Sequence, residues 1–169
     1  MQTTTRVAVI GGGVVGCSVL YHLTKLGWTD VMLLERSELT SGSTWHAAGG
    51  FYTLNGDTNM AALQSYTIKL YKELEEITGL FCGLHHVGGI TLADNKDRFD
   101  MLVVERAKHR YMDLETEIVG PEEFSKIVPV TNIDGVIGAL YDPLDSHLDP
   151  SGTTHAYAKT ARIGGATIQ

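Results

Sequence analysis

The sequence predicts an α/β fold with a parallel sheet, on three observations within its first 35 residues. A short apolar run, 7–10, ends in glycine, which is typical of a buried parallel strand. A helix is expected over 14–26, before a natural stop at Gly27, with an apolar stripe made of Val15, Val19, Leu20, Leu23 and Leu26. A second apolar run, 31–34, completes one βαβ unit of about 30 residues.

The turn between the first strand and the helix reads Gly11-Gly12-Gly13-Val14-Val15-Gly16, a GxGxxG pattern. Gly11 permits the tight turn, Gly13 lets a pyrophosphate approach the backbone, and Gly16 lets the helix pack closely. Free N–H groups and the helix dipole favour negative charge at that helix start. Glu35 ends the second strand, where a carboxylate accepts hydrogen bonds from a ribose diol and repels a 2′-phosphate. The turn therefore predicts a Rossmann-like site, and these features alone do not separate FAD from NAD.

The rest of the chain predicts further helices and strands. Pro121 suits a first helical position, and Asp149-Pro150 suits an N-cap followed by that position. Helices are expected over 59–78, 97–111, 121–127 and 150–163, strands over 89–93 and 136–140, and a polar loop over 37–51. Residues 166–168 resemble the start of another strand. Because that strand breaks off, we expect an incomplete domain, the N-terminal portion of a longer protein.

Composition and charge argue against several classes of partner. The net charge is −7, without a basic cluster, which disfavours nucleic acid and anionic membrane surfaces. No apolar run approaches the roughly 18 residues that cross a bilayer. The first six residues have neither a signal-peptide apolar region nor an Arg-rich leader, so a cytoplasmic location is expected. Cys17 and Cys82 form no ligand cluster, and no metal site is expected.

The segment Ser41-Gly42-Ser43-Thr44-Trp45-His46-Ala47-Ala48-Gly49-Gly50 suits close backbone approach to an extended cofactor. Its residues are small or hydroxylated, apart from the bulky Trp45 and His46. With the preceding Glu35-Arg36-Ser37-Glu38-Leu39-Thr40, it resembles the dimethylglycine dehydrogenase and sarcosine dehydrogenase family. These are FAD-dependent oxidoreductases of the D-amino-acid-oxidase-like superfamily. The resemblance continues to His147-Leu148-Asp149-Pro150 and covers nearly the whole chain. Ser146 departs from the family, in which many members have glycine at this place.

The resemblance implies that the cofactor is FAD rather than NAD. It also implies that His46 is the position of covalent attachment to the flavin 8α carbon, with a non-covalent His beside the flavin as the open alternative. The residues that match family FAD contacts are Val14, Val15, Glu35, Arg36, Gly42, Ser43, Thr44, Trp45, His46, Ala47, Ala48, Gly49 and Gly50. Residues 1–50 are then the FAD-binding βαβ unit with its flavin-contacting loop. Residues 51–169 are the remainder of a partial oxidoreductase domain, including part of an α+β substrate domain.

The implied activity is oxidative demethylation of an N-methyl amino acid such as dimethylglycine or sarcosine. The catalytic base and the electron acceptor are not assigned. Family members usually carry a C-terminal tetrahydrofolate-binding domain, which is expected to be absent here, and residues 1–169 alone are expected to bind FAD weakly and to be inactive. Two alternatives stay open, a non-catalytic flavin-binding regulatory homologue and an NAD-dependent dehydrogenase.

Several histidines outside this segment are interpreted as structural. His85-His86 has no Cys or carboxylate at metal-ligand spacing, so a loop or a strand-edge pair is expected. His147 lies between Asp145 and Asp149, where turn chemistry and a helix cap are the preferred interpretation.

Overall fold

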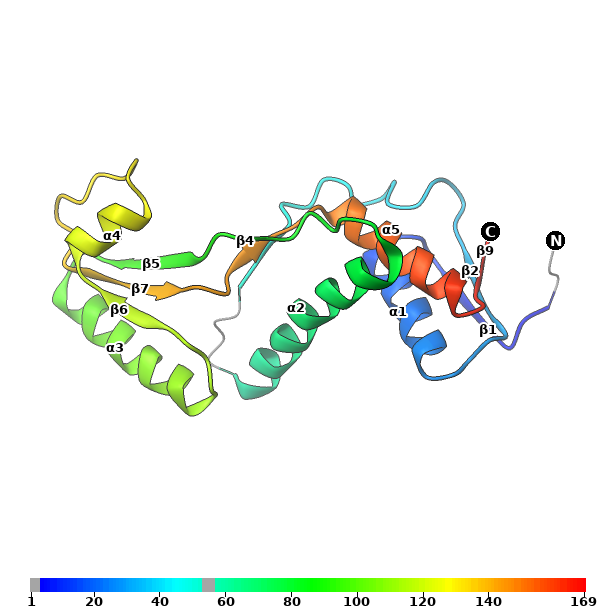
Figure 1. The fold of residues 1–169 in the computed structure, drawn as a ribbon, viewed down its shortest axis with the longest axis horizontal. Helices are drawn as coiled ribbons and strands as arrows, with labels where there is room; N and C mark the ends of the chain where they lie inside the picture. Colours follow the sequence, from blue (N-terminus) through cyan, green and yellow to red (C-terminus); the bar gives the residue numbers. More distant parts are fainter. Residues whose placement is uncertain (1–3, 53–56) are drawn as a thin grey trace. The chain divides into compact units, whose positions relative to one another are not determined.

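The computed structural model describes residues 4–52 and 57–169 (Figure 1). The chain forms two compact units, each made of segments that are separate in sequence. The first comprises Met1–Gly49, Ile68–Leu84 and Leu148–Gln169, and the second comprises Gly50–Thr67 and His85–His147. The two later segments of the first unit pack with its N-terminal segment. The expected boundary after residue 50, which separates the cofactor-binding segment from the rest, stays a prediction.

A parallel sheet with strand order β1-β2-β9 forms the centre of the first unit. Its strands are β1 (Val7–Ile10), β2 (Val31–Leu34) and β9 (Thr167–Ile168), and helix α1 (Val14–Lys25) connects β1 to β2. This is the βαβ unit that the glycine-rich turn predicts. Among the described residues β1 pairs only with β2, and Ile10 at its end is 85% exposed. One edge of the sheet therefore has no neighbouring strand in this part of the chain.

Helix α1 packs beside helix α5 (Pro150–Ile163) in this unit (Figure 1). Small residues of α5 are fully buried and allow close approach, namely Ala156, Ala158 and Ala161. The side chains that α1 buries are Cys17, Leu20 and Tyr21. The predicted stripe on α1 is wrong in part, because Val15, Val19 and Leu26 are exposed. Leu20 and Leu23, the other two residues of that stripe, pack in the core of the unit together with Cys17 and Tyr21.

Helix α2 (Thr58–Thr78) contributes residues to both units. Its C-terminal part buries Leu70 and Leu74 in the core of the first unit. The helix begins one residue before the predicted start because Asp57 accepts hydrogen bonds from the backbone N–H groups of Asn59 (2.9 Å) and Met60 (3.0 Å). No helix in the described part of the chain is long and apolar enough to span a membrane.

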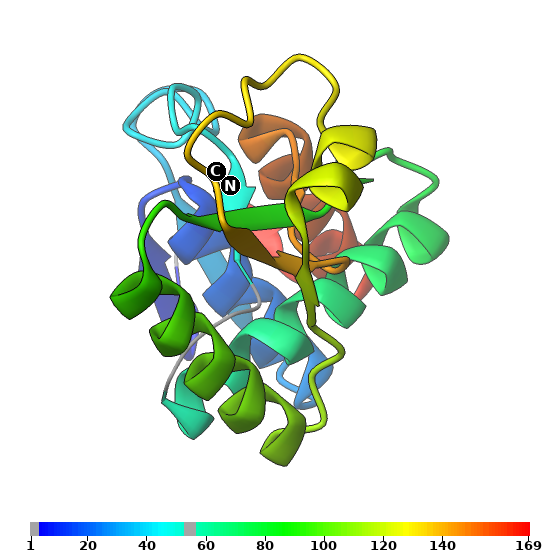
Figure 2. The same cartoon turned by 90° about the vertical axis from the view of Figure 1, so that its left-hand side faces the viewer.

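An antiparallel sheet with strand order β5-β7-β6 forms the centre of the second unit, and α3 runs along it (Figure 2). The elements are β5 (Gly89–Ala93), α3 (Lys96–Tyr111), β6 (Glu117–Val119), α4 (Pro121–Ile127) and β7 (Gly138–Asp142). Asn95 caps α3 through its side chain, so the helix begins one residue earlier than predicted. The strand predicted over 136–140 begins two residues late, because Val136 donates a turn hydrogen bond to Ile133 O.

The second unit contains another sheet, which is small. Its strand order is β3-β8-β4, and each strand has two residues. The strands are β3 (Gly50–Phe51), β4 (His85–His86) and β8 (Ser146–His147). The predicted loop over 37–51 is therefore wrong at its last two residues. Strands this short have no internal alternation of polar and apolar residues, so only their cross-strand partners define them.

Candidate cofactor site

The glycine-rich turn lies at the carboxyl ends of β1 and β2, where the chain enters α1. Gly11 has φ +108°, a left-handed conformation that favours glycine and reverses the chain sharply after β1. A Cβ atom at Gly16 would overlap the carbonyl oxygen of Gly11, so no side chain fits between the helix and the turn. These two positions have the mechanical roles that the motif predicts.

The first turn of α1 presents backbone N–H groups towards the space beyond the strand ends. Its first helical hydrogen bond runs from Cys17 N to Gly13 O (3.0 Å). The N–H groups of Val15 and Gly16 donate no hydrogen bond within the described residues. Donors of this kind at a helix start fit the pyrophosphate of a dinucleotide, because the helix dipole also favours negative charge there.

Glu35 follows β2, and its carboxylate bridges two backbone N–H groups. It accepts from Gly12 N (2.6 Å) and from Ser37 N (2.9 Å). The bond from Gly12, followed by that from Ser37, holds the pKa of the Glu35 carboxyl below its usual value. An ionised carboxylate has about four lone-pair sites, so it can accept ribose hydroxyls as well. Arg36 follows it as an exposed side chain.

The loop over 40–49 lies beside the glycine-rich turn and is tied to it by hydrogen bonds. Thr40, with φ +74°, donates from its N–H to Gly12 O (3.0 Å). The hydroxyl oxygen of Thr44 accepts from Val14 N (3.0 Å), and Thr44 is buried. The structure therefore brings the predicted loop residues and the predicted turn residues into one site.

Trp45 and His46 extend from this loop. Their rings meet edge to face with centroids 4.9 Å apart, and Trp45 is 63% exposed. The other predicted loop residues that are exposed are Gly42, Ser43, Ala47, Ala48 and Gly50. Because these rings and most of the loop are exposed, the part of an extended cofactor beyond its pyrophosphate could contact the loop.

Three residues that the GxGxxG motif does not specify also shape this site, namely Gly12, Ser37 and Leu39. Gly12 occupies a position that GxGxxG leaves open, yet a Cβ there would lie 3.0 Å from Glu35 Cγ and 3.1 Å from Glu35 Cβ, as well as against the end of the Leu39 side chain. Its N–H also binds Glu35, and the next hydrogen bond of that carboxylate comes from Ser37. The run of three glycines, one more than the motif requires here, is the sequence signal for this extra constraint.

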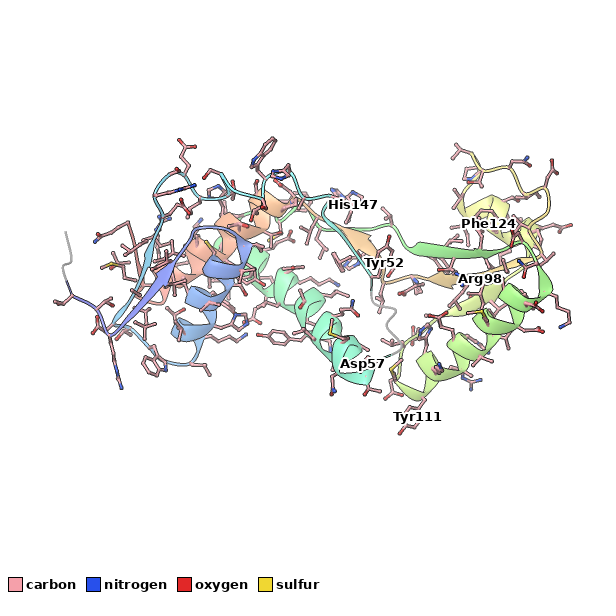
Figure 3. The ribbon with its side chains drawn as sticks, turned by 180° about the vertical axis from the view of Figure 1, so that it is seen from behind. Tyr52, Asp57, Arg98, Tyr111, Phe124 and His147 are labelled. Carbon is pink, nitrogen blue, oxygen red and sulfur yellow. The ribbon has the colours of Figure 1, made fainter. Side chains whose placement is uncertain are left out.

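The histidines outside the loop have structural contacts. The rings of His85 and His147 stack across β4 and β8 with centroids 5.0 Å apart, and His147 is labelled in Figure 3. Asp149 is the N-cap of α5 and accepts from Ser151 N (2.9 Å), which confirms the predicted helix cap. Ser146 bonds through its hydroxyl to His86 Nδ1 (2.7 Å), a contact that glycine could not make. Over 4–52 and 57–169 no group of three His, Cys, Asp or Glu side chains could hold a metal ion.

Comparison with known proteins adds what the site geometry leaves open. The sequence pattern of a family described as DAO, FAD-dependent oxidoreductase, matches residues 6–169. The chain belongs to this family of FAD-dependent oxidoreductases. Family membership selects FAD rather than NAD as the cofactor, which the glycine-rich turn and Glu35 alone do not.

Curated relatives agree with the predicted resemblance. The chain is 42% identical to mitochondrial dimethylglycine dehydrogenase from Rattus norvegicus, over 95% of this chain and 19% of the relative. It is 38% identical to human mitochondrial sarcosine dehydrogenase, over 99% of this chain and 18% of the relative. It is also 34% identical to the mitochondrial pyruvate dehydrogenase phosphatase regulatory subunit of Mus musculus, over 99% of this chain and 19% of the relative. The chain thus spans about a fifth of the length of these relatives.

A solved structure confirms the fold class and its partial extent. The L-proline dehydrogenase from P. horikoshii superposes with a TM-score of 0.90 at 27% identity. The match covers 99% of this chain but 44% of that enzyme. The α/β fold with part of an α+β domain is therefore confirmed, and the chain corresponds to a partial flavin domain of this family. The individual FAD contacts, including His46, stay predictions.

Proposed function

We propose that this chain is the cofactor-binding N-terminal portion of an FAD-dependent enzyme that oxidises N-methyl amino acids such as dimethylglycine or sarcosine. The observation that carries the proposal is the combination of two N–H groups at the start of α1, which have no partner among the described residues, with the carboxylate of Glu35, in a member of this oxidoreductase family. The names of the most similar relatives support the substrate class.

Each part of the site has a distinct role in this proposal. The N–H groups of Val15 and Gly16 hold the pyrophosphate, and Glu35 accepts the ribose hydroxyls. The loop over 41–50 lies along the flavin half, with the imidazole of His46 as the candidate for covalent attachment. FAD, when bound, supplies the hydride acceptor for oxidation of the N-methyl group. The protein's contribution is to bind and orient the two halves of the cofactor.

A non-catalytic, flavin-binding regulatory homologue is the second candidate. The 34% identity to the regulatory subunit of pyruvate dehydrogenase phosphatase favours it, because that relative aligns over the same length as the dehydrogenases. The glycine-rich turn and Glu35 serve cofactor binding in either case, so the two candidates differ in turnover rather than in flavin content.

Turnover separates the two candidates. The full-length protein that contains this chain should be purified and mixed with dimethylglycine or sarcosine and an artificial electron acceptor. Substrate-dependent reduction of the acceptor, with release of formaldehyde, is the expected result. A flavin-loaded protein that reduces no acceptor with either substrate would favour the regulatory candidate. Yellow colour that stays with the acid-precipitated protein would establish covalent attachment, and acid precipitation of His46→Ala should then release the flavin into the supernatant.

Residues 1–169 alone are proposed to bind FAD weakly and to be inactive. In support, β1 has an open edge within the described residues, and the side chains of Ile10 and Val15 beside the turn are 85% and 74% exposed. A tight, stoichiometric FAD complex of this segment, measured by flavin fluorescence, would contradict this proposal.

A tetrahydrofolate site would lie outside this chain, and the cytoplasmic location stays a prediction.

A further inference from the structure

The helix that starts at the glycine-rich turn receives its cap from a distant loop. Its own N-cap residue, Gly13, has no side chain and makes no capping bond. Instead, Thr44 Oγ1 accepts a hydrogen bond of 3.0 Å from the N–H of Val14, the first residue of α1. The two residues are separated by 30 positions in sequence. Thr44 is only 8% exposed, so this hydroxyl is enclosed at the helix start.

Helices α3, α4 and α5 begin differently in the described part of the chain. Helices α3 and α5 are capped locally, by Asn95 and Asp149. Helix α4 also has a glycine N-cap, Gly120, but Pro121 at its first position has no N–H that needs a partner. In α1 the corresponding N–H exists and is bound by Thr44.

The glycine at the N-cap and the hydroxyl of the loop fit each other. A Cβ atom at Gly13 would lie 3.0 Å from Thr44 Oγ1, which is tighter than ordinary packing allows. A side chain at position 13 would therefore require Thr44 to shift by a few tenths of an ångström. Thr44 binds only the N–H of Val14. The next two N–H groups, of Val15 and Gly16, have no partner among the described residues, and the pyrophosphate is proposed to bind there.

Thr44 immediately precedes Trp45 and His46, the two rings of the loop. The loop has a second tie to the turn, from Thr40 N to Gly12 O (3.0 Å). These two hydrogen bonds, at Thr40 and Thr44, lie on either side of residues 41–43. They fix the position from which Trp45 and His46 extend away from the turn. We infer that Thr44 is a positioning residue. It caps α1 from a loop that is distant in sequence, and it thereby holds the flavin-contacting loop at a fixed place relative to the pyrophosphate site. This inference rests on the proposed binding of FAD.

Comparing ADP with FAD separates this role from general damage to the helix. ADP contains the ribose and diphosphate that the turn and Glu35 would bind, whereas FAD also reaches the loop. Thr44→Val removes the acceptor and keeps nearly the same shape. We expect it to raise the Kd for FAD about tenfold, the loss typical of one hydrogen bond with its ordering, and the Kd for ADP less than about threefold. Thr44→Ser keeps the hydroxyl and should restore FAD binding.

The measurement uses the full-length protein, recovered without cofactor from riboflavin-limited cells. A His46→Ala background removes covalent attachment from the binding equilibrium, and the Kd values are measured by calorimetry. Thr160→Val is the matched control, because Thr160 is equally buried (8% exposed) and its hydroxyl donates within its own helix to Ala156 O (2.9 Å). The control should leave both Kd values unchanged.

Each outcome of the comparison is decisive. Equal losses for ADP and FAD in Thr44→Val would overturn the inference, because they would indicate damage to the helix start. Unchanged or tighter FAD binding would overturn it as well, since the freed Val14 N–H would then serve the phosphate better than the loop. A parent protein that binds neither ligand would instead contradict the proposed function.

Discussion

The carboxylate of Glu35 accepts a hydrogen bond of 2.6 Å from the backbone N–H of Gly12. This bond joins the end of β2 to the turn after β1, across 23 residues of sequence. The acidic residue that is expected to bind the ribose therefore also holds the glycine-rich turn in shape. Loss of this carboxylate should affect the turn before any cofactor is present.

Glu35→Gln should weaken binding of FAD and ADP by about tenfold each, because a charge-assisted hydrogen bond to Gly12 becomes a weaker neutral one. Calorimetry with each ligand measures the effect. Glu38→Gln removes the same charge from an exposed neighbour and is the matched control. Similar losses in both variants would indicate a general effect of net charge.

The same contact predicts the pH dependence of cofactor binding. The pKa of Glu35 in the folded protein lies below 4.5, its ordinary value, owing first to the Gly12 N–H and then to the Ser37 N–H. A lowered pKa means that the stabilising contact is complete above pH 4.5 and is lost as the pH falls towards the lower native value. ADP affinity should therefore fall in acid more steeply in the parent protein than in Glu35→Gln. Parallel pH profiles would be the contrary result.

Gly16→Ala should destabilise the first unit by more than about 2 kcal/mol, because the added methyl group overlaps the carbonyl oxygen of Gly11. Urea unfolding measures the change in the free energy of unfolding. Gly42→Ala is the control for stability, since a Cβ there meets no atom within 4 Å. An equal stability of the two variants would show that the helix can move away from the turn.

His109 predicts acid sensitivity of the second unit. The ring is fully buried, Nδ1 lies 3.3 Å from Thr116 Oγ1, and Nε2 has no hydrogen-bond partner among the described residues. Burial lowers the pKa of His109, against weaker opposing effects of Glu105 and Asp142, while Lys108 lowers it further. The neutral ring therefore stabilises the fold above pH 6.5, and this contribution is lost as the pH falls below that value.

His109→Gln should flatten the pH dependence of stability below pH 6.5, as followed by urea unfolding at several pH values. His155→Gln replaces an exposed histidine on α5 and should retain the slope of the parent protein. A parent protein whose stability is constant from pH 7 down to about 5 would exclude a buried, neutral His109.

The sequence was sufficient for elements that have strong local signals. The bounds of α4 and α5 are as predicted, because Pro121 and Asp149-Pro150 define their first residues. The strands β1, β2 and β5 are likewise as predicted. For His85–His86 the sequence analysis left a loop and a strand-edge pair open, because the pairing that decides between them lies about 60 residues away, in the register His86↔Ser146.

The site was predictable as a set of residues but not as a set of contacts. The motif places Glu35 near a ribose, yet its bond to Gly12 arises only when β1 and β2 pair in register. Likewise, the composition of the loop indicates close approach to a cofactor, whereas the bond from Val14 to Thr44 depends on how the loop folds back. Tertiary approach, rather than residue type, determines both contacts.

The central proposal is that this chain binds FAD as part of an enzyme that oxidises N-methyl amino acids. Its most direct test is the absorbance spectrum of the purified full-length protein, recorded without oxygen before and after addition of dimethylglycine or sarcosine. The account predicts a flavin spectrum that is bleached by at least one of these amines. A protein without flavin, or a flavin spectrum that neither amine changes, would contradict it.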